Sequence, residues 1–116
     1  MKKIIFTDDD PTIREIIELI LGDSYELKMY SSGEPLMTNG FELPDLFLLD
    51  RQLSGVDGLD VCRFLKSQEK TKHIPVIIIS ATSNVVRHAL QAGADDVIEK
   101  PILIAELRKM IARHLS

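Results

Sequence analysis

The sequence predicts an α/β fold in which a doubly wound, five-stranded parallel sheet carries helices on both faces. Five short apolar runs alternate with five segments that show helical spacing or a helix-start signal. Two of these runs, residues 46–49 and 76–79, are apolar throughout, which is typical of strands covered on both sides. The crossovers have about the length of a strand–helix–strand unit, so the pattern favours a parallel sheet.

The first strand and the first helix are joined by an acidic run. A strand is expected at residues 4–7, and three aspartates follow it. Asp10 is well placed to cap a helix that begins at Pro11, and Gly22 is a candidate for its C-cap. The apolar residues of this helix recur on one face: Ile13, Ile16, Ile17, Ile20 and Leu21.

The middle of the chain contains the central strand. Residues 25–30 alternate weakly and predict a second strand, followed at 31–39 by a short helix that fails by Asn39 and Gly40. The central strand is expected at residues 46–50 and ends in Asp50. Asp57 can then cap a helix whose inward residues are Leu59, Cys62 and Leu65.

The last third of the chain repeats the strand–helix pattern twice. Residues 76–79 are the most β-prone run, and a helix at 84–91 ends at Gly93. A short strand is expected at 96–99, and a final helix at 102–115. That helix carries its apolar residues on one face: Ile104, Leu107, Ile111 and Leu115.

Length and composition indicate one domain that spans residues 1–116. With 45% hydrophobic residues, the chain can bury a core without a disulfide or a structural metal. The single cysteine, Cys62, has no internal partner, and no Cys/His cluster has zinc spacing. Lys2 and Lys3 precede only three apolar residues, so we expect neither a signal peptide nor a membrane span, and a cytoplasmic location.

The net charge of −4 argues against a surface built for nucleic acid. If DNA is involved, a partner would have to supply the contact. We therefore expect no direct nucleic-acid binding by this domain.

Polar side chains that could take part in catalysis or ligand binding follow the expected strands: Asp8 with Asp9, Asp50, Ser80 and Lys100. In a doubly wound sheet they would meet at the edge formed by the carboxyl ends of the strands. If the strand order is 2-1-3-4-5, the three carboxylates crowd one crevice. Their repulsion requires either a proton or a bound cation, and an all-oxygen ligand set favours Mg²⁺.

This set meets the needs of phosphoryl transfer onto a carboxylate. An aspartate can act as the nucleophile, while a metal ion and Lys100 neutralise the phosphoryl oxygens. Ser80 can donate a hydrogen bond to one of those oxygens. Each residue also has a plainer interpretation as a helix cap, a loop carboxylate, a strand-end hydroxyl or a solvated charge, but their joint placement at strand ends favours the chemical one.

On these residues the chain resembles a response-regulator receiver domain of two-component signalling. The likeness lies in the acidic end of the first strand at 4–11, the acceptor segment at 48–58, Ile79-Ser80-Ala81, and residues 92–96 with Lys100-Pro101. It covers essentially the whole chain. The resemblance implies a flavodoxin-like (βα)₅ fold, with sheet order 2-1-3-4-5, and a phosphoacceptor that is not an enzyme in its own right.

The resemblance also implies residue roles. Asp50 would accept a phosphoryl group from a histidine kinase or a histidine phosphotransfer protein. Asp9, Asp50 and the backbone carbonyl of Gln52 would bind Mg²⁺, and Asp8 would hold a metal-bound water. Ser80 and Lys100 would contact the phosphoryl group, with the bond from Lys100 to Pro101 in the cis form.

Three positions depart from the family pattern. Arg51 places a charge after the acceptor where an apolar residue is common, and Ser54 replaces a frequent proline. Val97 stands at the switch position, where many members carry an aromatic ring, and a valine has no large rotamer swing to report phosphorylation. Gln52 and Thr82 flank the site, where side chains are expected to tune dephosphorylation.

The output surface in the family is formed by the helix expected at 84–91, the strand at 96–99 and the helix at 102–115. Several basic residues could give this surface a positive charge, although solvated charges explain them equally well. The output partner or fused effector stays open, and the chain is expected to be a monomer or a weak homodimer. The basic residues are Arg87, His88, Arg108, Lys109 and Arg113.

Two other functions compete with a phosphorylation switch. One is a constitutive interaction module on the same fold, which Val97 favours and the intact acidic site opposes. The other is a small phosphatase of the haloacid-dehalogenase type, with Asp8 as nucleophile and Asp10 as acid/base. That enzyme needs a later acidic metal motif, and Asp95-Asp96 precedes an apolar strand instead of following one.

Overall fold

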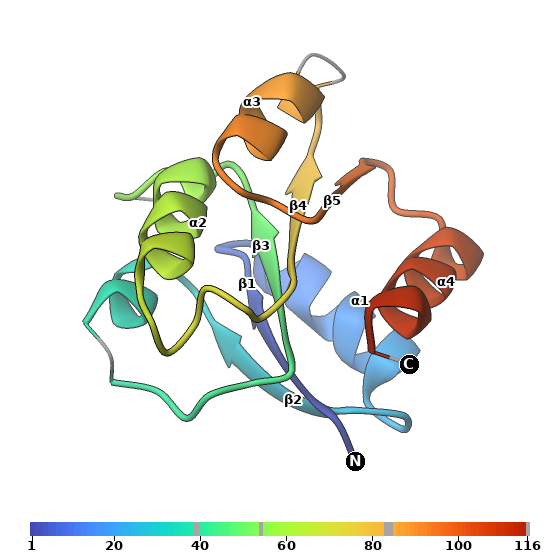
Figure 1. The fold of residues 1–116 in the computed structure, drawn as a ribbon. Helices are drawn as coiled ribbons and strands as arrows, with labels where there is room; N and C mark the ends of the chain where they lie inside the picture. Colours follow the sequence, from blue (N-terminus) through green and yellow to red (C-terminus); the bar gives the residue numbers. More distant parts are fainter. Residues whose placement is uncertain (39, 54, 83–84, 116) are drawn as a thin grey trace.

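The computed structural model describes residues 1–38, 40–53, 55–82 and 85–115; Asn39, Ser54 and Asn84, on which predictions were made, lie outside them. Five parallel strands form one sheet in the order β2-β1-β3-β4-β5 (Figure 1). This confirms the predicted fold class and strand order. The strands are β1 (Lys3–Thr7), β2 (Glu26–Tyr30), β3 (Leu46–Asp50), β4 (Val76–Ser80) and β5 (Asp96–Glu99).

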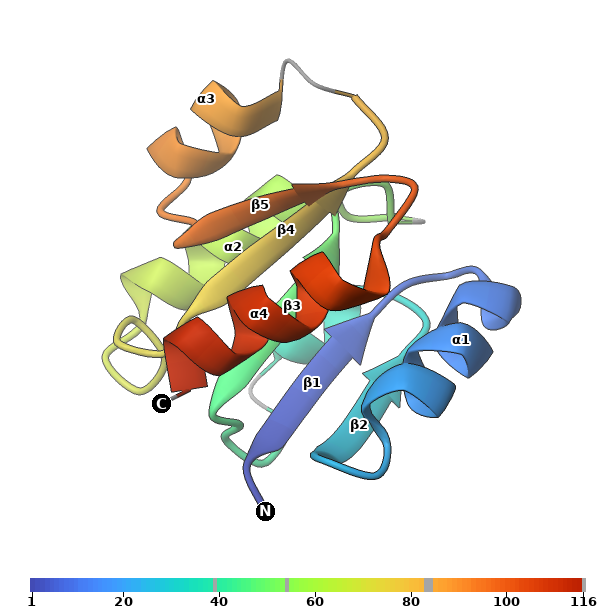
Figure 2. The same ribbon diagram turned by 90° about the vertical axis from the view of Figure 1, so that its right-hand side faces the viewer.

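Helices cover both faces of the sheet, as predicted (Figure 2). Helices α1 and α4 pack on one face, and η1, α2 and α3 pack on the other. None of the helices in the described part of the chain is long and apolar enough to cross a membrane. Their bounds are α1 (Pro11–Leu21), η1 (Glu34–Met37), α2 (Gly58–Ser67), α3 (Val85–Gln91) and α4 (Ile104–Leu115).

The helix expected at 31–39 is only the four-residue 3₁₀ helix η1. Thr38 ends it, because both its N–H and its hydroxyl donate to the carbonyl oxygen of Pro35, at 3.5 and 3.1 Å. These contacts close a single tight turn, and no apolar periodicity follows to extend it. The predicted short helix is therefore present within this segment, as one 3₁₀ turn.

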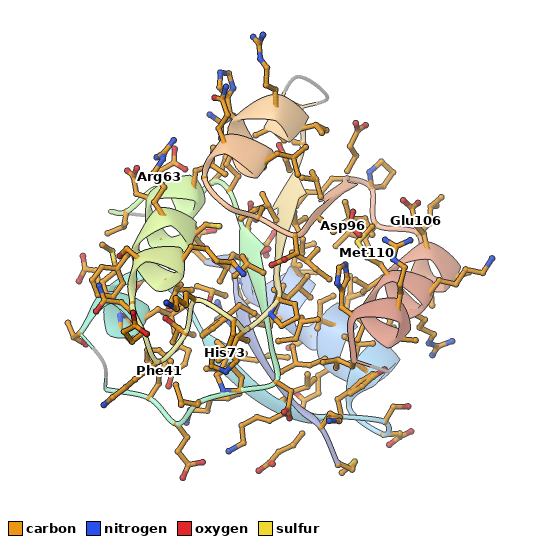
Figure 3. The ribbon with its side chains drawn as sticks, in the orientation of Figure 1. Phe41, Arg63, His73, Asp96, Glu106 and Met110 are labelled. Atoms are coloured by element: carbon orange, nitrogen blue, oxygen red, sulfur yellow. The ribbon has the colours of Figure 1, made fainter. Side chains whose placement is uncertain are left out.

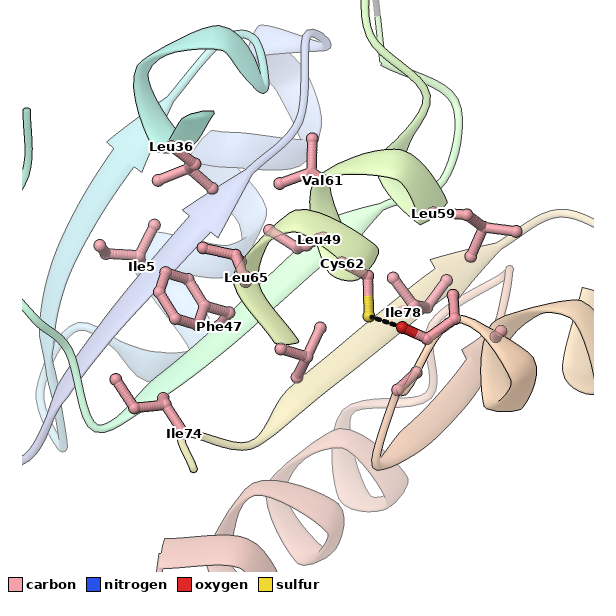
Figure 4. Packing of buried hydrophobic residues seen from close by; sticks show 14 of the residues in the cluster. Ile5, Leu36, Phe47, Leu49, Leu59, Val61, Cys62, Leu65, Ile74 and Ile78 are labelled. Carbon is pink, nitrogen blue, oxygen red and sulfur yellow. Dashed lines mark hydrogen bonds between the residues drawn. The ribbon is translucent and has the colours of Figure 1, made fainter. Parts of the chain in front are cut away.

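The core lies on both sides of β3, whose five residues are all buried. Because side chains alternate along a strand, Phe47 and Leu49 face the cluster under α2 and α3, whereas Leu46 and Leu48 face the cluster under α1 and α4. Figure 4 shows the first cluster, in which Cys62 donates from its thiol to the carbonyl oxygen of Ala92 at 3.5 Å. Burial raises the pKa of this thiol to about 11.

The predicted helix caps are present. Asp10 accepts from the N–H of Thr12 at 2.9 Å, and Asp57 accepts from the N–H of Leu59 at 2.8 Å. Gly22 is the C-cap of α1, although its φ of −62° is one that any residue adopts. The caps fix the first turns of α1 and α2. They therefore also fix the loops that join these helices to the carboxyl ends of β1 and β3.

Candidate functional site

The carboxyl ends of three neighbouring strands bring the candidate residues together. Asp50 is the last residue of β3, and Asp8 directly follows β1, its neighbour in the sheet. Ser80 ends β4 on the other side, and its carbonyl oxygen accepts from the N–H of Lys100 at 2.8 Å. The sheet order thus places residues that are far apart in sequence at one edge.

Asp50 is a buried carboxylate with a partner on each oxygen. Its side chain accepts from the N–H of Gln52 at 2.9 Å through Oδ1 and from the Lys100 ammonium at 2.8 Å through Oδ2. Burial alone would lower the pKa of Lys100, but the hydrogen bond with Asp50 and the negative charges of Asp50 and Asp8 raise it above its ordinary value. Lys100 is therefore a fixed cation at this carboxylate.

Asp8 is more deeply buried, with 1% of its surface exposed. Its Oδ1 accepts from the N–H of Asp10 at 2.9 Å, whereas Oδ2 has no hydrogen-bond partner and lies 3.9 Å from the Lys100 ammonium. Burial, reinforced by the adjacent Asp50 carboxyl, raises the pKa of Asp8 to about 7. A buried acceptor without a donor, next to a second carboxylate, fits a hard cation bound through oxygen ligands.

Asp9 occupies a different place from its neighbour. It is exposed and lines an open hollow together with Arg51, Gln52, Leu53 and Asp57. Within the described residues, no three carboxylate, His or Cys side chains converge as a metal-binding group. The three carboxylates therefore do not converge in this arrangement: the turn directs Asp8 inward and leaves Asp9 at the rim, beside Arg51 and Gln52.

Ser80 is buried, and its hydroxyl is already engaged. Its Oγ accepts from the N–H of Thr82 at 3.1 Å and lies 3.2 Å from the Thr82 hydroxyl. Val97 pairs in register with Ile78 and is half-buried against the core cluster under α2 and α3. The Lys100–Pro101 bond is cis, the form that the family resemblance implies.

Arg14 is a residue of this region that sequence reasoning missed. Its guanidinium donates to the main-chain carbonyl oxygen of Asp8 at 2.7 Å. A cation near the N-terminus of a helix opposes the helix dipole. That unfavourable placement was the signal in the sequence that could have drawn attention to it.

The basic surface considered for output is smaller than the sequence suggested. Arg113 and His114, at the C-terminal end of α4, both contact the carboxylate of Asp96, which is labelled in Figure 3. Arg108 donates to the carbonyl oxygen of Ile20 at 3.2 Å, so it joins α4 to α1. Two of the expected basic residues are therefore engaged in intramolecular contacts.

Gly58 allows the acceptor strand to approach α2 closely. A Cβ at this position would lie 2.2 Å from the carbonyl oxygen of Asp50 and 2.8 Å from the Cα of Arg51. We expect Gly58→Ala to destabilise the protein by about 2–4 kcal/mol, because main-chain atoms must move to relieve the clash. Chemical denaturation will measure this loss. Gly40→Ala is the control, since its nearest contact would be Thr38 Oγ1 at 3.7 Å, and an equal loss in both variants would contradict the argument.

Comparison with known proteins identifies the family. The family model of the response regulator receiver domain matches residues 4–112. The DNA-binding response regulator MtrA of Mycolicibacterium smegmatis is 33% identical over 121 residues, which cover 97% of this chain and 52% of that protein. The chain thus spans about half the length of such relatives.

Solved structures agree with this assignment. The signal receiver domain of a signal transduction histidine kinase from Syntrophus aciditrophicus is 31% identical with a TM-score of 0.91, covering 99% of this chain and 90% of that one. The response regulator TrrA of Thermotoga maritima, solved in complex with Mg²⁺-BeF, is 30% identical with a TM-score of 0.87, covering 99% and 100%. The chain belongs to the response regulator receiver domain family of two-component signalling.

Proposed function

We propose that this domain is a phosphorylation-dependent switch that accepts a phosphoryl group on Asp50 from a histidine kinase or a histidine phosphotransfer protein. The observation that carries the proposal is the buried Asp50 carboxylate, held by the Gln52 N–H and the Lys100 ammonium at the end of the central strand. A carboxylate that is oriented in this way can attack phosphorus while the imidazole of the donor leaves.

The surrounding residues then stabilise the product. Lys100 can turn from the carboxylate to a phosphoryl oxygen, because its ammonium is already at hydrogen-bond distance from Oδ2 of Asp50. The Ser80 hydroxyl can donate to another oxygen once it leaves Thr82. Val97 has no aromatic ring to rotate. Instead, the Ser80 hydroxyl would exchange its bond to Thr82 for one to the phosphoryl group, and this exchange would transmit phosphorylation of Asp50 to the segment that follows β4.

We assign Mg²⁺ to the acidic edge. Asp50, Asp9 and the carbonyl of Gln52 would be direct ligands, with Asp8 holding a metal-bound water; Asp9 would have to swing inward from the rim. When bound, the ion neutralises phosphoryl charge and orients the reacting groups. The unpartnered Oδ2 of Asp8 and the likeness to TrrA, solved with Mg²⁺-BeF, support this assignment.

An apolar groove beside Lys100 offers a docking surface for the phosphodonor. It is lined by residues of α1 and of the loop that begins α4, including Ile16, Ile20, Pro101 and Ile104. A donor histidine that reaches Asp50 brings its protein over this groove, because the groove starts at Lys100 itself. The donor is therefore expected to present apolar side chains next to its histidine.

We expect Ile16→Glu to slow phosphoryl transfer from a cognate kinase at least tenfold, because it places a charge in the apolar contact. Transfer from acetyl phosphate should stay at the parent rate, since a small donor does not cover the groove. Leu19→Glu is the matched control on the same helix, because Leu19 is 83% exposed and does not line the groove. Equal slowing in both variants would refute this docking site.

For output, we propose the surface formed by α3, β5 and α4. It exposes Leu90 and Leu103, with exposed fractions of 54% and 61%. MtrA is a DNA-binding response regulator of about twice the length of this chain, so we propose that a partner or a fused effector, and not this domain, makes any DNA contact. The switch would work in the cytoplasm as a monomer or weak homodimer, with an output partner identified by its preference for one phosphorylation state.

The intact mass of the protein after incubation with acetyl phosphate tests the function. The expected result is the gain of one phosphoryl group that requires Mg²⁺ and is lost on treatment with hydroxylamine, as an acyl phosphate is. No adduct, even with a kinase and a rapid quench, would instead favour the constitutive interaction module. The phosphatase alternative finds no support, because Asp10 serves as the cap of α1.

A further inference from the structure

Arg14 bridges the turn that carries the acidic run. It lies in the first helical turns of α1, and its half-buried side chain reaches back to the carbonyl oxygen of Asp8, six residues earlier, at 2.7 Å. The main-chain N–H of the same residue donates to the carbonyl oxygen of Asp10 at 3.1 Å. The bond to Asp10 is the first-turn helix bond that any residue here would make, so the contribution of the arginine side chain is its bond to Asp8.

The contact completes the restraints on Asp8. The N–H of Asp8 donates to the carbonyl oxygen of Tyr30 at 3.2 Å, and its Oδ1 accepts from the N–H of Asp10 at 2.9 Å. With the carbonyl held by Arg14, the main chain is fixed on both sides of the Asp8 side chain. Oδ2, which has no hydrogen-bond partner, is the oxygen left to face the acidic edge.

We propose that Arg14 is a positioning residue for the divalent-cation site. It holds the carbonyl of Asp8 and so sets the direction in which the Asp8 carboxylate meets the cation or its water. Arg14 acts through Asp8 and does not contact the ion. The inference rests on the proposed magnesium-dependent function and adds a residue to it.

The geometry explains why an arginine occupies an electrostatically poor position. A cation near the positive end of a helix is disfavoured, and the hydrogen bond to Asp8 together with the nearby carboxylates offsets that effect. Partners that orient metal ligands typically change metal affinity by 10–100-fold when they are removed. The same order of effect is expected here.

Calorimetric titration with Mg²⁺ alone tests the proposal in three variants. Arg14→Met removes the hydrogen bond, and Arg14→Lys keeps a charged donor that can still reach the carbonyl. Arg108→Met is the matched control, because Arg108 also donates to a main-chain carbonyl, that of Ile20 at 3.2 Å, but at the opposite end of α1.

We expect Arg14→Met to weaken Mg²⁺ binding roughly 10–100-fold and Arg14→Lys to recover most of the loss. The control, Arg108→Met, should bind Mg²⁺ with the affinity of the parent protein, even if its melting temperature falls by as much as that of Arg14→Met. In phosphorylation by acetyl phosphate, Arg14→Met should need more Mg²⁺ for half of the maximal rate and should approach the parent rate at saturating Mg²⁺.

Parent-like Mg²⁺ affinity in Arg14→Met would overturn the inference, as would an equal loss in Arg108→Met. If Arg14→Met does not fold, Arg14→Lys decides: Mg²⁺ affinity close to that of the parent supports the inference, and a loss of roughly tenfold or more overturns it. If the parent protein neither binds Mg²⁺ nor forms a phosphoryl adduct, the proposed function itself is contradicted. This result differs from failure of the Arg14 inference alone, in which the parent protein still binds Mg²⁺ and forms the adduct.

Discussion

Asp50→Ala is expected to abolish the phosphoryl adduct completely. Each oxygen of the Asp50 carboxylate accepts one hydrogen bond, from the Gln52 N–H at 2.9 Å and from the Lys100 ammonium at 2.8 Å, and these bonds orient it for attack. Neighbouring carboxylates cannot replace it, because Asp8 is directed toward the N–H of Asp10 and Asp9 lies at the rim. Intact mass after treatment with acetyl phosphate and Mg²⁺ measures the loss.

Asp10→Asn is the control in the same acidic run. Asparagine caps a helix as well as aspartate does, so α1 and the adduct should both survive. An adduct that persists in Asp50→Ala but disappears in Asp8→Ala would move the acceptor to Asp8 and revive the phosphatase interpretation. Loss of the adduct in Asp10→Asn as well would also contradict the assignment, because Asp10 would then have a chemical role.

Asp8→Asn is expected to stabilise the metal-free protein above neutral pH. Burial beside Asp50 raises the pKa of Asp8 from 3.8 to about 7 in the folded state. The folded protein therefore binds this proton more tightly than the unfolded chain does. The stability from this group is complete below about pH 4 and is lost as the pH rises through about 7.

Between about pH 5 and pH 8, this group should cost the metal-free parent roughly 2–3 kcal/mol of unfolding free energy, a loss that Asp8→Asn avoids. Urea denaturation in the presence of EDTA at both pH values measures the difference, and subtraction of the variant removes the contribution of the histidines. Mg²⁺ should stabilise the parent at pH 8 more than it stabilises the variant. The same pH slope in parent and variant would show that Asp8 titrates normally.

The helix caps and strand positions were predictable because they depend on local patterns. The apolar runs of β3 and β4 marked buried strands, and Asp10 with Pro11 marked the start of α1. The short helix expected after residue 31 is present, but the sequence did not predict its type, because a proline and a run of turn-forming residues suit an α-helix start and a 3₁₀ turn alike. Thr38 closes them into one 3₁₀ turn instead.

The sequence by itself determined the parallel sheet and the strand ends at which Asp8, Asp50, Ser80 and Lys100 lie, because strand periodicity and crossover length restrict the topology. The strand order followed from the family resemblance, and the structure confirms it. Only the tertiary structure decided which carboxylates are buried together. Asp8 and Asp9 are adjacent and identical in sequence, yet one is buried and the other exposed. The direction of a side chain in a turn depends on partners such as Arg14 and Lys100, which no local pattern connects to it.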